Sequence, residues 1–390
     1  MKIAIAHDYF AQLGGAELVA QELYNMFPDA DMHSLVAFPE AMPAGLKNVS
    51  VQTTWMQHLP WIRKYFRMYF LLYPYALKSM DLKKYDLVIS STSGYAKGIA
   101  TGSNTLHICY CHTPTRWIWN YSNYAEHEVM NSIKKVVLGK LTHSMRQWDK
   151  RAALFPDHFI ANSQTVAERI YKIYHRSAEV IHPPIDINRF RPCKEQEDYY
   201  LILARLLPYK RIDLAVAACT KLNRRLLVIG KGPDRKRLES MAGPSVTFLG
   251  KLSNADVEHY VSHCRALLFP GEEDFGMAPL EVAAAGRPTI AYRAGGALET
   301  IVDGVTGIYF SHQESRYLER AILDFEQMQW SQEALCAHAA KFSVQVFQNN
   351  MRNFIAQAGY HLPAHRAQLV IPQKHASLPV LQETKRSISA

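Results

Sequence analysis

The chain has 390 residues, a length that suggests two domains or one large one. Hydrophobic residues make up 48% of the chain and charged residues 20%, which excludes a mainly disordered chain and a fibrous protein. The formal net charge of +9 favours anionic partners such as nucleotides, phosphates or an acidic membrane surface, without choosing among them.

The six cysteines are expected to be free thiols in a reducing cytosol, because none forms a C-x-x-C pair. The apolar stretch after Met1 is too short for a signal peptide. The longest apolar run, Met68–Leu77, is interrupted by Pro74 and has about half of the ~20 residues that a membrane-spanning helix requires. We therefore expect neither secretion nor a membrane span.

Short apolar runs alternate with helical patterns along most of the chain, which predicts parallel sheets with helices on their faces. In the first half the expected strands are Lys2–His7, Leu87–Ser91, Leu106–Tyr110 and His158–Ala161. The expected helices are Ala16–Phe27 and Thr165–Tyr174, the second preceded by Asn162 and Ser163 as candidate caps.

The segment from Trp61 to Tyr73 interleaves aromatic residues with cations. On one helix this pattern suits an anionic membrane interface, where each surface cation adds about 1 kcal/mol. A helix with its aromatic side chains in the core and its cations in solvent is the alternative. The residues expected to face a membrane or an acceptor are Trp61, Arg63, Lys64 and Arg67.

A second series of elements begins near Tyr199, after a connector in which Pro183 and Pro184 stop regular structure. Its expected strands are Tyr200–Ala204, Leu226–Ile229, Val246–Leu249, Ala266–Phe269 and Thr289–Tyr292. Its expected helices are Arg211–Lys221, Asp234–Met241, Asn254–Cys264 and Gly276–Ala285.

This pattern predicts an α/β protein with two Rossmann-like domains, 1–182 and 183–343, facing each other across a cleft. A C-terminal helix within 344–360 could pack on either domain, including back on the first. The extension 361–390 has few large apolar residues and is expected to be partly disordered.

Ligands of open parallel sheets bind beyond the carboxyl ends of the strands, near helix N-termini. After the first strand, Gly14 and Gly15 would let an anion or a sugar approach the backbone, although a plain turn explains such a pair equally well. After the first strand of the second domain, Arg205 and Lys210 can both point at one diphosphate. A solvated basic turn is the alternative for these two cations.

The most informative stretch runs from Phe269 to Glu281 and is rich in acidic residues. Glu273 lies in a loop and Glu281 about a turn and a half into the next helix, so both are expected to face the cleft and bind hydroxyls of a sugar and a ribose. The backbone at Gly276 would be available to a phosphate. Acidic residues also cap a helix N-terminus without any function, but a cap does not account for Glu281.

Several motifs follow one another in order: Arg205…Lys210, Gly230-Lys231-Gly232-Pro233, Phe248-Leu249-Gly250, Glu273-x7-Glu281, Ala294-Gly295-Gly296-x-x-Glu299 and Asp303-Gly304-x-x-Gly307. Together they resemble the retaining glycosyltransferases of family 4, which have the GT-B fold, over roughly residues 1–360. The front of the chain is similar to a narrower branch, the bacterial mannosyltransferases of O-antigen (lipopolysaccharide) and related polysaccharide assembly. The motifs that carry this second resemblance are His7-Asp8, Gly14-Gly15-Ala16-Glu17 and Cys111-His112-Thr113-Pro114-Thr115-Arg116-Trp117.

The resemblance implies GDP-mannose as donor, a lipid-linked saccharide as acceptor and peripheral attachment to the cytoplasmic face of the plasma membrane. Carried over by position, it implies that Arg205 and Lys210 bind the donor diphosphate and stabilise the leaving nucleotide. Glu281 would hold the ribose, and Glu273 and His112 would contact the transferred sugar. The other implied donor contacts are Gly14, Gly15, Leu252, Phe275, Gly276, Met277 and Ala278.

The family retains anomeric configuration, and we favour front-face attack over a double displacement. No metal or other cofactor is expected, because the one Asp-x-Asp, Asp29-Ala30-Asp31, is expected in a surface turn of the wrong domain. A UDP- or dTDP-sugar donor, a sugar-nucleotide epimerase and a non-catalytic sugar-nucleotide-binding scaffold are the alternatives. A dinucleotide oxidoreductase would need a third glycine after Gly230 and Gly232, and no motif supports nucleic-acid binding.

Overall fold

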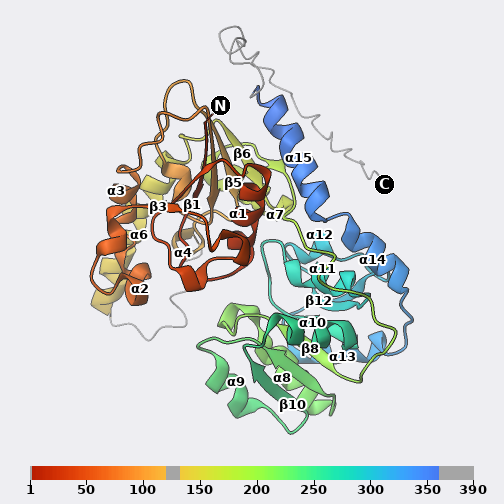
Figure 1. Cartoon of the computed structure of the whole chain (residues 1–390). Helices are drawn as coiled ribbons and strands as arrows, with labels where there is room; N and C mark the ends of the chain where they lie inside the picture. Colours follow the sequence, from red (N-terminus) through yellow and green to blue (C-terminus); the bar gives the residue numbers. More distant parts are fainter. Residues whose placement is uncertain (1, 120–131, 360–390) are drawn as a thin grey trace, which may run out of the picture.

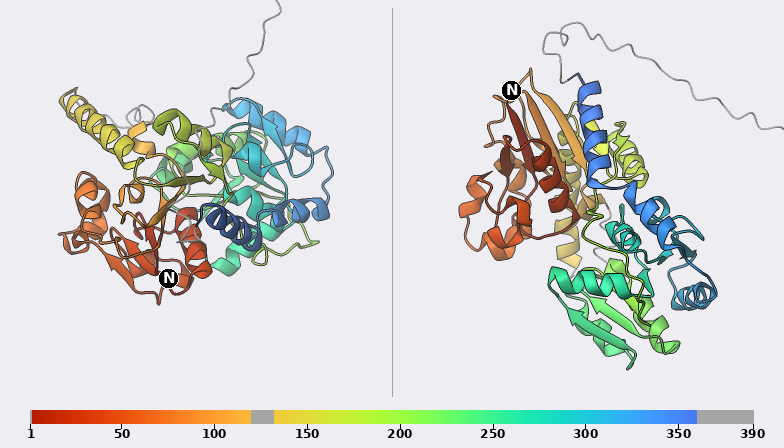
Figure 2. Two further views of the ribbon diagram at one scale, coloured as in Figure 1. Left: turned by 90° about the horizontal axis from the view of Figure 1, so that it is seen from above. Right: turned by 45° about the vertical axis from the view of Figure 1, so that its right-hand side comes forward.

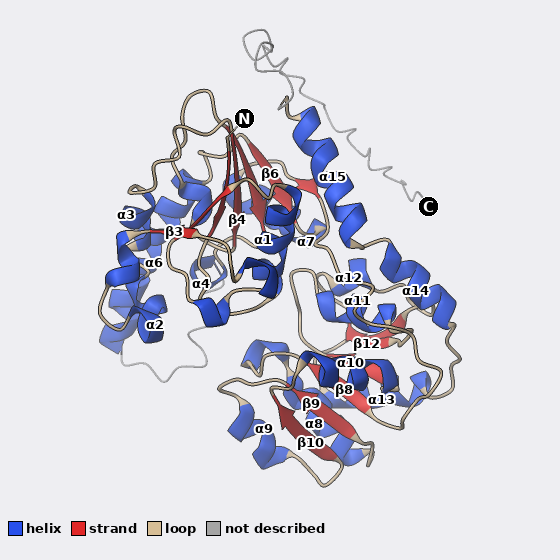
Figure 3. Ribbon diagram, in the orientation of Figure 1, coloured by secondary structure: helices blue, strands red, loops and turns tan. Residues whose placement is uncertain are grey.

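The computed structural model describes residues 2–119 and 132–359. Within these ranges the chain forms two parallel sheets, each flanked by helices (Figures 1 and 3). The first sheet has the order β3-β2-β1-β4-β5-β6-β7. Its strands are β1 (Ile3–His7), β2 (Asp31–Ser34), β3 (Val51–Thr53), β4 (Leu87–Thr92), β5 (Leu106–Cys111), β6 (His158–Ala161) and β7 (Glu179–Val180).

The second sheet has the order β10-β9-β8-β11-β12-β13, so both sheets are doubly wound in the same way. Its strands are β8 (Tyr200–Leu203), β9 (Leu226–Ile229), β10 (Val246–Gly250), β11 (Ala266–Phe269), β12 (Thr289–Tyr292) and β13 (Gly307–Phe310). The central strands are buried along their whole length, which is why they are apolar runs and not alternating patterns.

Helices cover both faces of each sheet. Those of the first domain are α1 (Gly15–Met26), α2 (Ile62–Tyr65), α3 (Tyr73–Leu77), α4 (Arg116–Trp119), α6 (Ser132–Ala152) and α7 (Gln164–Tyr174). Those of the second are α8 (Ile212–Lys221), α9 (Arg235–Met241), α10 (Asn254–His263), α11 (Met277–Ala284), α12 (Ala297–Thr300), α13 (Ser315–Phe325) and α14 (Gln332–Ala340).

The last described helix, α15 (Val344–Gln357), leaves the second domain and packs on the first (Figures 1 and 2). Phe347, Met351 and Ile355 are buried in the same core cluster as Val19 and Leu23 of α1. The chain therefore crosses back to the domain from which it started. The extension 361–390 lies outside the described residues.

The structure corrects the sequence reading of the segment that begins at Trp61. It is not one helix: α2 is followed by a 3₁₀ turn, Phe66–Tyr69, and then by α3. Trp61 itself adopts a left-handed conformation, with φ of 48°. The strands β2, β3, β7 and β13 were not predicted either, because none has more than four residues and so few residues give no clear periodic signal. The helices α6, α13 and α14 were also missed.

Candidate active site

The carboxyl edges of the two sheets come together at the starts of α1 and α11. A Cβ added to Gly15 would lie 2.8 Å from Sδ of Met277, so the two helix N-termini touch across the domain interface. Gln12, which precedes α1, accepts hydrogen bonds through Oε1 from Arg205 at 3.0 Å and from Arg67 at 2.9 Å. The loops that the sequence singled out in separate domains are therefore neighbours in space.

Asp274 is the main polar link between the domains. Arg116 Nη2 lies 2.5 Å from Asp274 Oδ2, and Arg169 of α7 pairs with the other carboxylate oxygen. Ser163 Oγ donates to the backbone oxygen of Asp274 at 2.6 Å. Asp274 follows Glu273 directly, so the first domain holds the loop that carries the predicted sugar contact.

Lys210 and Glu273 form an ion pair at the end of the short 3₁₀ turn Pro208–Lys210. Burial, together with the nearby cations Arg205 and Arg116, lowers the pKa of Lys210 to about 7, with Asp274 acting in the opposite direction. Arg116 also lies over the ring of Tyr209, 5.0 Å from its centroid. The structure thus adds Arg116, contributed by the first domain, to the two cations that the motifs had indicated.

The start of α11 needs a glycine. Gly276 has φ of +87°, and a Cβ there would lie 2.9 Å from the Phe269 ring. The side chain of Phe275 is buried and stacks on His182 at 5.2 Å, so it anchors the loop and only its backbone remains for a donor. Burial raises the pKa of the Glu281 carboxyl group, with Arg189 acting in the opposite direction.

The other predicted donor positions lie around this edge. Met277 and Ala278, at the first positions of α11, are partly buried against the core of the second domain. Leu252 follows β10 and packs on the same core. Gly14 precedes α1 with an extended backbone. These positions therefore lie at the carboxyl edges of the two sheets, as the sequence predicted.

His112 follows β5 directly and is buried, with 7% of its surface exposed. Its Nε2 lies 2.8 Å from Ser91 Oγ. Burial, together with the neighbouring His7, lowers the pKa of His112 to about 3. The ring is therefore neutral near pH 7, which suits a hydrogen-bonding role better than a charged one.

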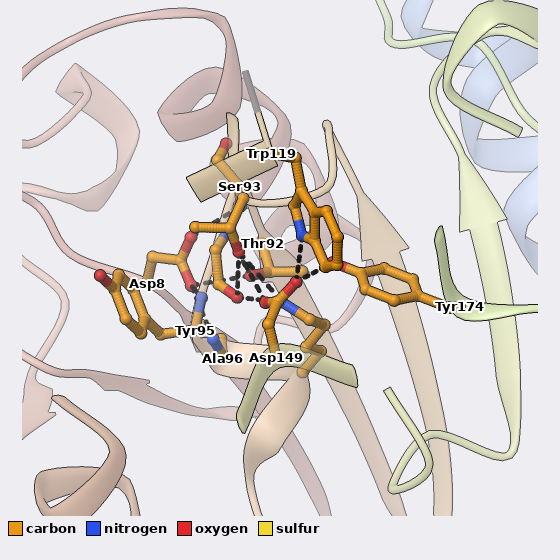
Figure 4. Close-up of polar contacts among 11 residues, drawn as sticks. Asp8, Thr92, Ser93, Tyr95, Ala96, Trp119, Asp149 and Tyr174 are labelled. Atoms are coloured by element: carbon orange, nitrogen blue, oxygen red, sulfur yellow. Dashed lines mark hydrogen bonds and ion pairs between the residues drawn. The ribbon is translucent and has the colours of Figure 1, made fainter. Parts of the chain in front are cut away.

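Two buried carboxylates, Asp8 and Asp149, organise neighbouring loops of the first domain (Figure 4). Asp8 accepts hydrogen bonds from Thr92 Oγ1 and from the backbone amides of Ser93, Tyr95 and Ala96, which fixes the turn after β4. This contact explains the Asp in the His7-Asp8 motif.

Asp149, on α6, accepts from Thr115 Oγ1, Trp119 Nε1 and Tyr174 OH at 2.7 Å each (Figure 4). Lys97 Nζ lies 2.6 Å from Asp149 Oδ1, with both side chains almost fully buried. The sequence did not point to Asp149 or Lys97, because their partners are far away along the chain. Together these contacts hold α4, and with it Arg116, in place.

The Asp-x-Asp motif does not belong to the site. As expected, Asp29 lies in an exposed turn; Asp31 follows as the exposed first residue of β2, and its Oδ2 accepts from Tyr85 OH at 2.6 Å. It pairs in register with Ala4, near the amino end of β1, and so lies at the opposite edge of the sheet. Folding does bring together Cys193, Glu195 and His263, whose ligand atoms lie within 4.8 Å of one another. Cys193 and Glu195 lie before β8 and His263 before β11, so this group is at the amino edge of the second sheet, opposite the loops at the carboxyl edge.

The surface around Trp61 combines exposed aromatic and apolar side chains with cations. Trp61 is 76% exposed and Met68 73%, whereas Ile62 and Phe66 are buried in the core. Arg63 pairs with Glu40, and Arg67 is hydrogen-bonded to Gln12. Among the described residues, no helix has both the length and the apolar character needed to cross a membrane.

Two family models match the chain in sequence. Residues 13–189 match the model described as Glycosyltransferase Family 4, and residues 185–342 match the one described as Glycosyl transferases group 1. An uncharacterised glycosyltransferase of Methanocaldococcus jannaschii is 22% identical over 88% of this chain and 93% of its own length. The D-inositol 3-phosphate glycosyltransferase of Mycobacterium avium is 28% identical, over 39% of this chain and 42% of its own length.

Solved structures share the fold. Sucrose-phosphate synthase from Thermosynechococcus elongatus has a TM-score of 0.71 at 17% identity, covering 93% of this chain and all of that one. Anabaena HepE, solved in complex with UDP-glucose, has a TM-score of 0.67 at 18% identity, covering 92% of this chain and all of that one. The two doubly wound sheets, the facing donor loops and these matches agree: the chain belongs to the family 4 glycosyltransferases and has the GT-B fold.

Proposed function

We propose that the chain transfers mannose from GDP-mannose, with retention of configuration, to a lipid-linked saccharide acceptor in the assembly of O-antigen or a related surface polysaccharide. Binding of a nucleotide-sugar donor is supported by the cluster of Lys210, Arg205 and Arg116 beside the Glu273 carboxylate. The narrower resemblance at the front of the chain supports mannose.

The reaction develops negative charge on the leaving diphosphate and positive charge on the sugar ring. Preorganised cations stabilise the first of these charges, and Lys210, Arg205 and Arg116 supply them without a metal ion. Glu273 would contact the sugar hydroxyls, where its carboxylate offsets the second charge. Its pairing with Lys210 favours this role, with front-face attack, over that of a nucleophile in a double displacement.

Glu281 would hold the ribose, while the backbone at Gly276 and Met277 would receive a phosphate oxygen. His112 would reach the transferred sugar from the first domain. Exposed Trp61 and Lys64 would attach the protein to the cytoplasmic face of an anionic membrane, where a lipid-linked acceptor is found.

A UDP-sugar donor is the second candidate, favoured by the shared fold with HepE, which was solved with UDP and with UDP-glucose. Thermal melting of the purified protein separates the two. Each nucleotide sugar (GDP-mannose, UDP-glucose and a dTDP-sugar) is tested beside its free nucleoside diphosphate. A ligand that binds only the native state at a hundredfold excess over Kd adds about 2.7 kcal/mol of stability.

A shift confined to GDP and GDP-mannose, and lost in Arg205→Ala, supports the mannosyltransferase proposal. A shift confined to uridine or thymidine nucleotides rejects GDP-mannose and keeps the reaction type. If a nucleotide sugar shifts the melting temperature but no sugar is transferred, the chain is a non-catalytic scaffold. If no nucleotide shifts the melting temperature and no sugar is transferred, the proposal is wrong.

A further inference from the structure

Four buried polar side chains of the first domain form a continuous series of contacts: Glu17, His7, Ser91 and His112. Ser91 Oγ lies 2.8 Å from His112 Nε2 and 3.1 Å from His7 Nδ1. On its other side, His7 Nε2 lies 3.9 Å from Oε1 of Glu17. Ser91 is fully buried, and His7 and Glu17 are each 3% exposed.

These residues meet because three adjacent strands end at the same edge of the sheet. His7 ends β1 and pairs in register with Ser91 of β4, while His112 follows β5, the neighbour of β4. Glu17 reaches the same point from the first turn of α1. A Cβ on Gly14 would lie 3.1 Å from Glu17 Oε2, so glycine leaves room for this carboxylate.

The charge of Glu17 determines which atom carries each proton in this series of four side chains. A carboxylate favours an N–H at the facing His7 Nε2 and disfavours a lone pair there. His7 Nδ1 then accepts the single proton of the Ser91 hydroxyl, and Ser91 Oγ accepts from an N–H at His112 Nε2. Since the His112 ring is neutral, Nδ1 is left unprotonated. At 3.9 Å, Glu17 acts through its charge in a buried setting, not through a short hydrogen bond.

We propose that Glu17, His7 and Ser91 are positioning residues that hold His112 in the Nε2–H tautomer, so that Nδ1 accepts a hydrogen bond from a hydroxyl of the transferred sugar. In the described part of the chain, Nδ1 has no hydrogen-bond partner of its own. The sugar contact rests on the proposed function, whereas the tautomer does not.

The tautomer is tested by NMR of the full-length protein with ¹⁵N-labelled histidine, using His112→Asn to assign the His112 signal. The wild type is expected to show the Nε2–H form. Glu17→Gln removes the charge and offers an amide donor to His7 Nε2, and is expected to shift His112 toward the Nδ1–H form. Ser91→Ala removes the hydroxyl that links His7 to His112 and is expected to give a mixture of the two tautomers. It serves as a second variant if Glu17→Gln does not fold.

Ser90→Ala is the matched control. Ser90 is next to Ser91 in β4, is equally buried, and lies 2.8 Å from Nε2 of another buried histidine, His107. Ser90 is not part of the series that links Glu17 to His112, so the His112 signal is expected to stay as in the wild type. An Nδ1–H tautomer in the wild type, or an unchanged His112 signal in both Glu17→Gln and Ser91→Ala, overturns the inference.

The sugar contact is tested with the donor and its monodeoxy analogues. In the wild type, removal of the hydroxyl that His112 binds should lower kcat/KM by about tenfold, the equivalent of one hydrogen bond. Ser91→Ala should lose most of this discrimination, whereas Ser90→Ala should keep it. A wild type that transfers no sugar contradicts the proposed function and leaves the NMR result standing. Equal discrimination in the wild type and Ser91→Ala contradicts the positioning role alone.

Discussion

Arg116 of the first domain donates a hydrogen bond to Asp274 of the second, with Nη2 2.5 Å from Oδ2. Arg169 holds the other oxygen of the same carboxylate. Since Asp274 follows Glu273 in the chain and Arg116 lies beside Lys210, this pair joins the contact between the domains to the geometry of the proposed donor site. Closure is a common requirement for assembling a site shared by two domains.

Breaking this link should impair catalysis more than folding. Asp274→Ala is expected to lower kcat/KM for the donor by about tenfold or more, because a hydrogen bond to a charged group contributes roughly 1.5–3 kcal/mol. Small-angle X-ray scattering should show a larger radius of gyration. Lys172→Ala, which removes an exposed pair with Glu168 on the same helix as Arg169, is the control. Unchanged kinetics and dimensions in Asp274→Ala would show that the contact does not govern closure.

Donor affinity should fall as the pH rises above neutrality. Burial lowers the pKa of Lys210 to about 7, and a bound diphosphate favours its protonated form, so binding takes up a proton above that pH. Donor affinity is then highest below pH 7. Above pH 7 it decreases by up to about tenfold per pH unit, until the pH reaches the raised pKa of Lys210 in the complex. Calorimetry with the nucleotide sugar is the measurement.

Lys210→Arg is the matched variant, because arginine stays charged throughout this pH range. Its donor affinity, whatever its value at pH 7, is expected to be flat between pH 6.5 and about 9. If the wild type is equally flat, another group neutralises the diphosphate.

The two glutamates should separate nucleotide binding from sugar chemistry. Glu281→Gln is expected to weaken binding of the free nucleoside diphosphate by about tenfold, through loss of a charge-assisted hydrogen bond to the ribose. Glu273→Gln should bind the same nucleotide at least as tightly, because it frees Lys210, while kcat falls by about a hundredfold. Matching losses of nucleotide affinity in the two variants would be evidence against these separate roles.

The buried Lys97–Asp149 pair should be the most sensitive point of the first domain. Lys97→Met leaves a buried carboxylate without its counter-charge and is expected to cost roughly 3–5 kcal/mol, seen as a lower melting temperature. The double variant Lys97→Met/Asp149→Asn should lose less than the sum of the single changes. Arg320→Ala, which removes an exposed pair with Asp324, should leave the melting temperature unchanged.

Membrane attachment should depend on the exposed residues near α2. The double variant Trp61→Ala/Lys64→Ala is expected to lower co-sedimentation with anionic vesicles by about fivefold or more, since one surface cation alone contributes about 1 kcal/mol. Tyr171→Ala removes an exposed aromatic side chain from α7 and serves as the control. Binding that is the same for the double variant and the wild type would rule out this surface.

Several features were predictable from the sequence alone. The alternation of apolar runs with helical patterns indicated two parallel sheets, because a strand buried on both faces is locally apolar. Motifs at strand ends, such as Glu273-x7-Glu281, could be assigned to the ligand edge, because that edge follows from strand direction.

Tertiary structure decided how those loops meet. Asp149 gathers Lys97, Thr115 and Tyr174 from separate elements, and Arg116 finds Asp274 in the other domain. Local sequence patterns cannot predict such contacts, since they depend on sheet order and on the placement of the two domains. The lowered pKa of Lys210 and the tautomer proposed for His112 could not be predicted for the same reason. Each depends on burial and on neighbouring charges that come close only when the chain folds.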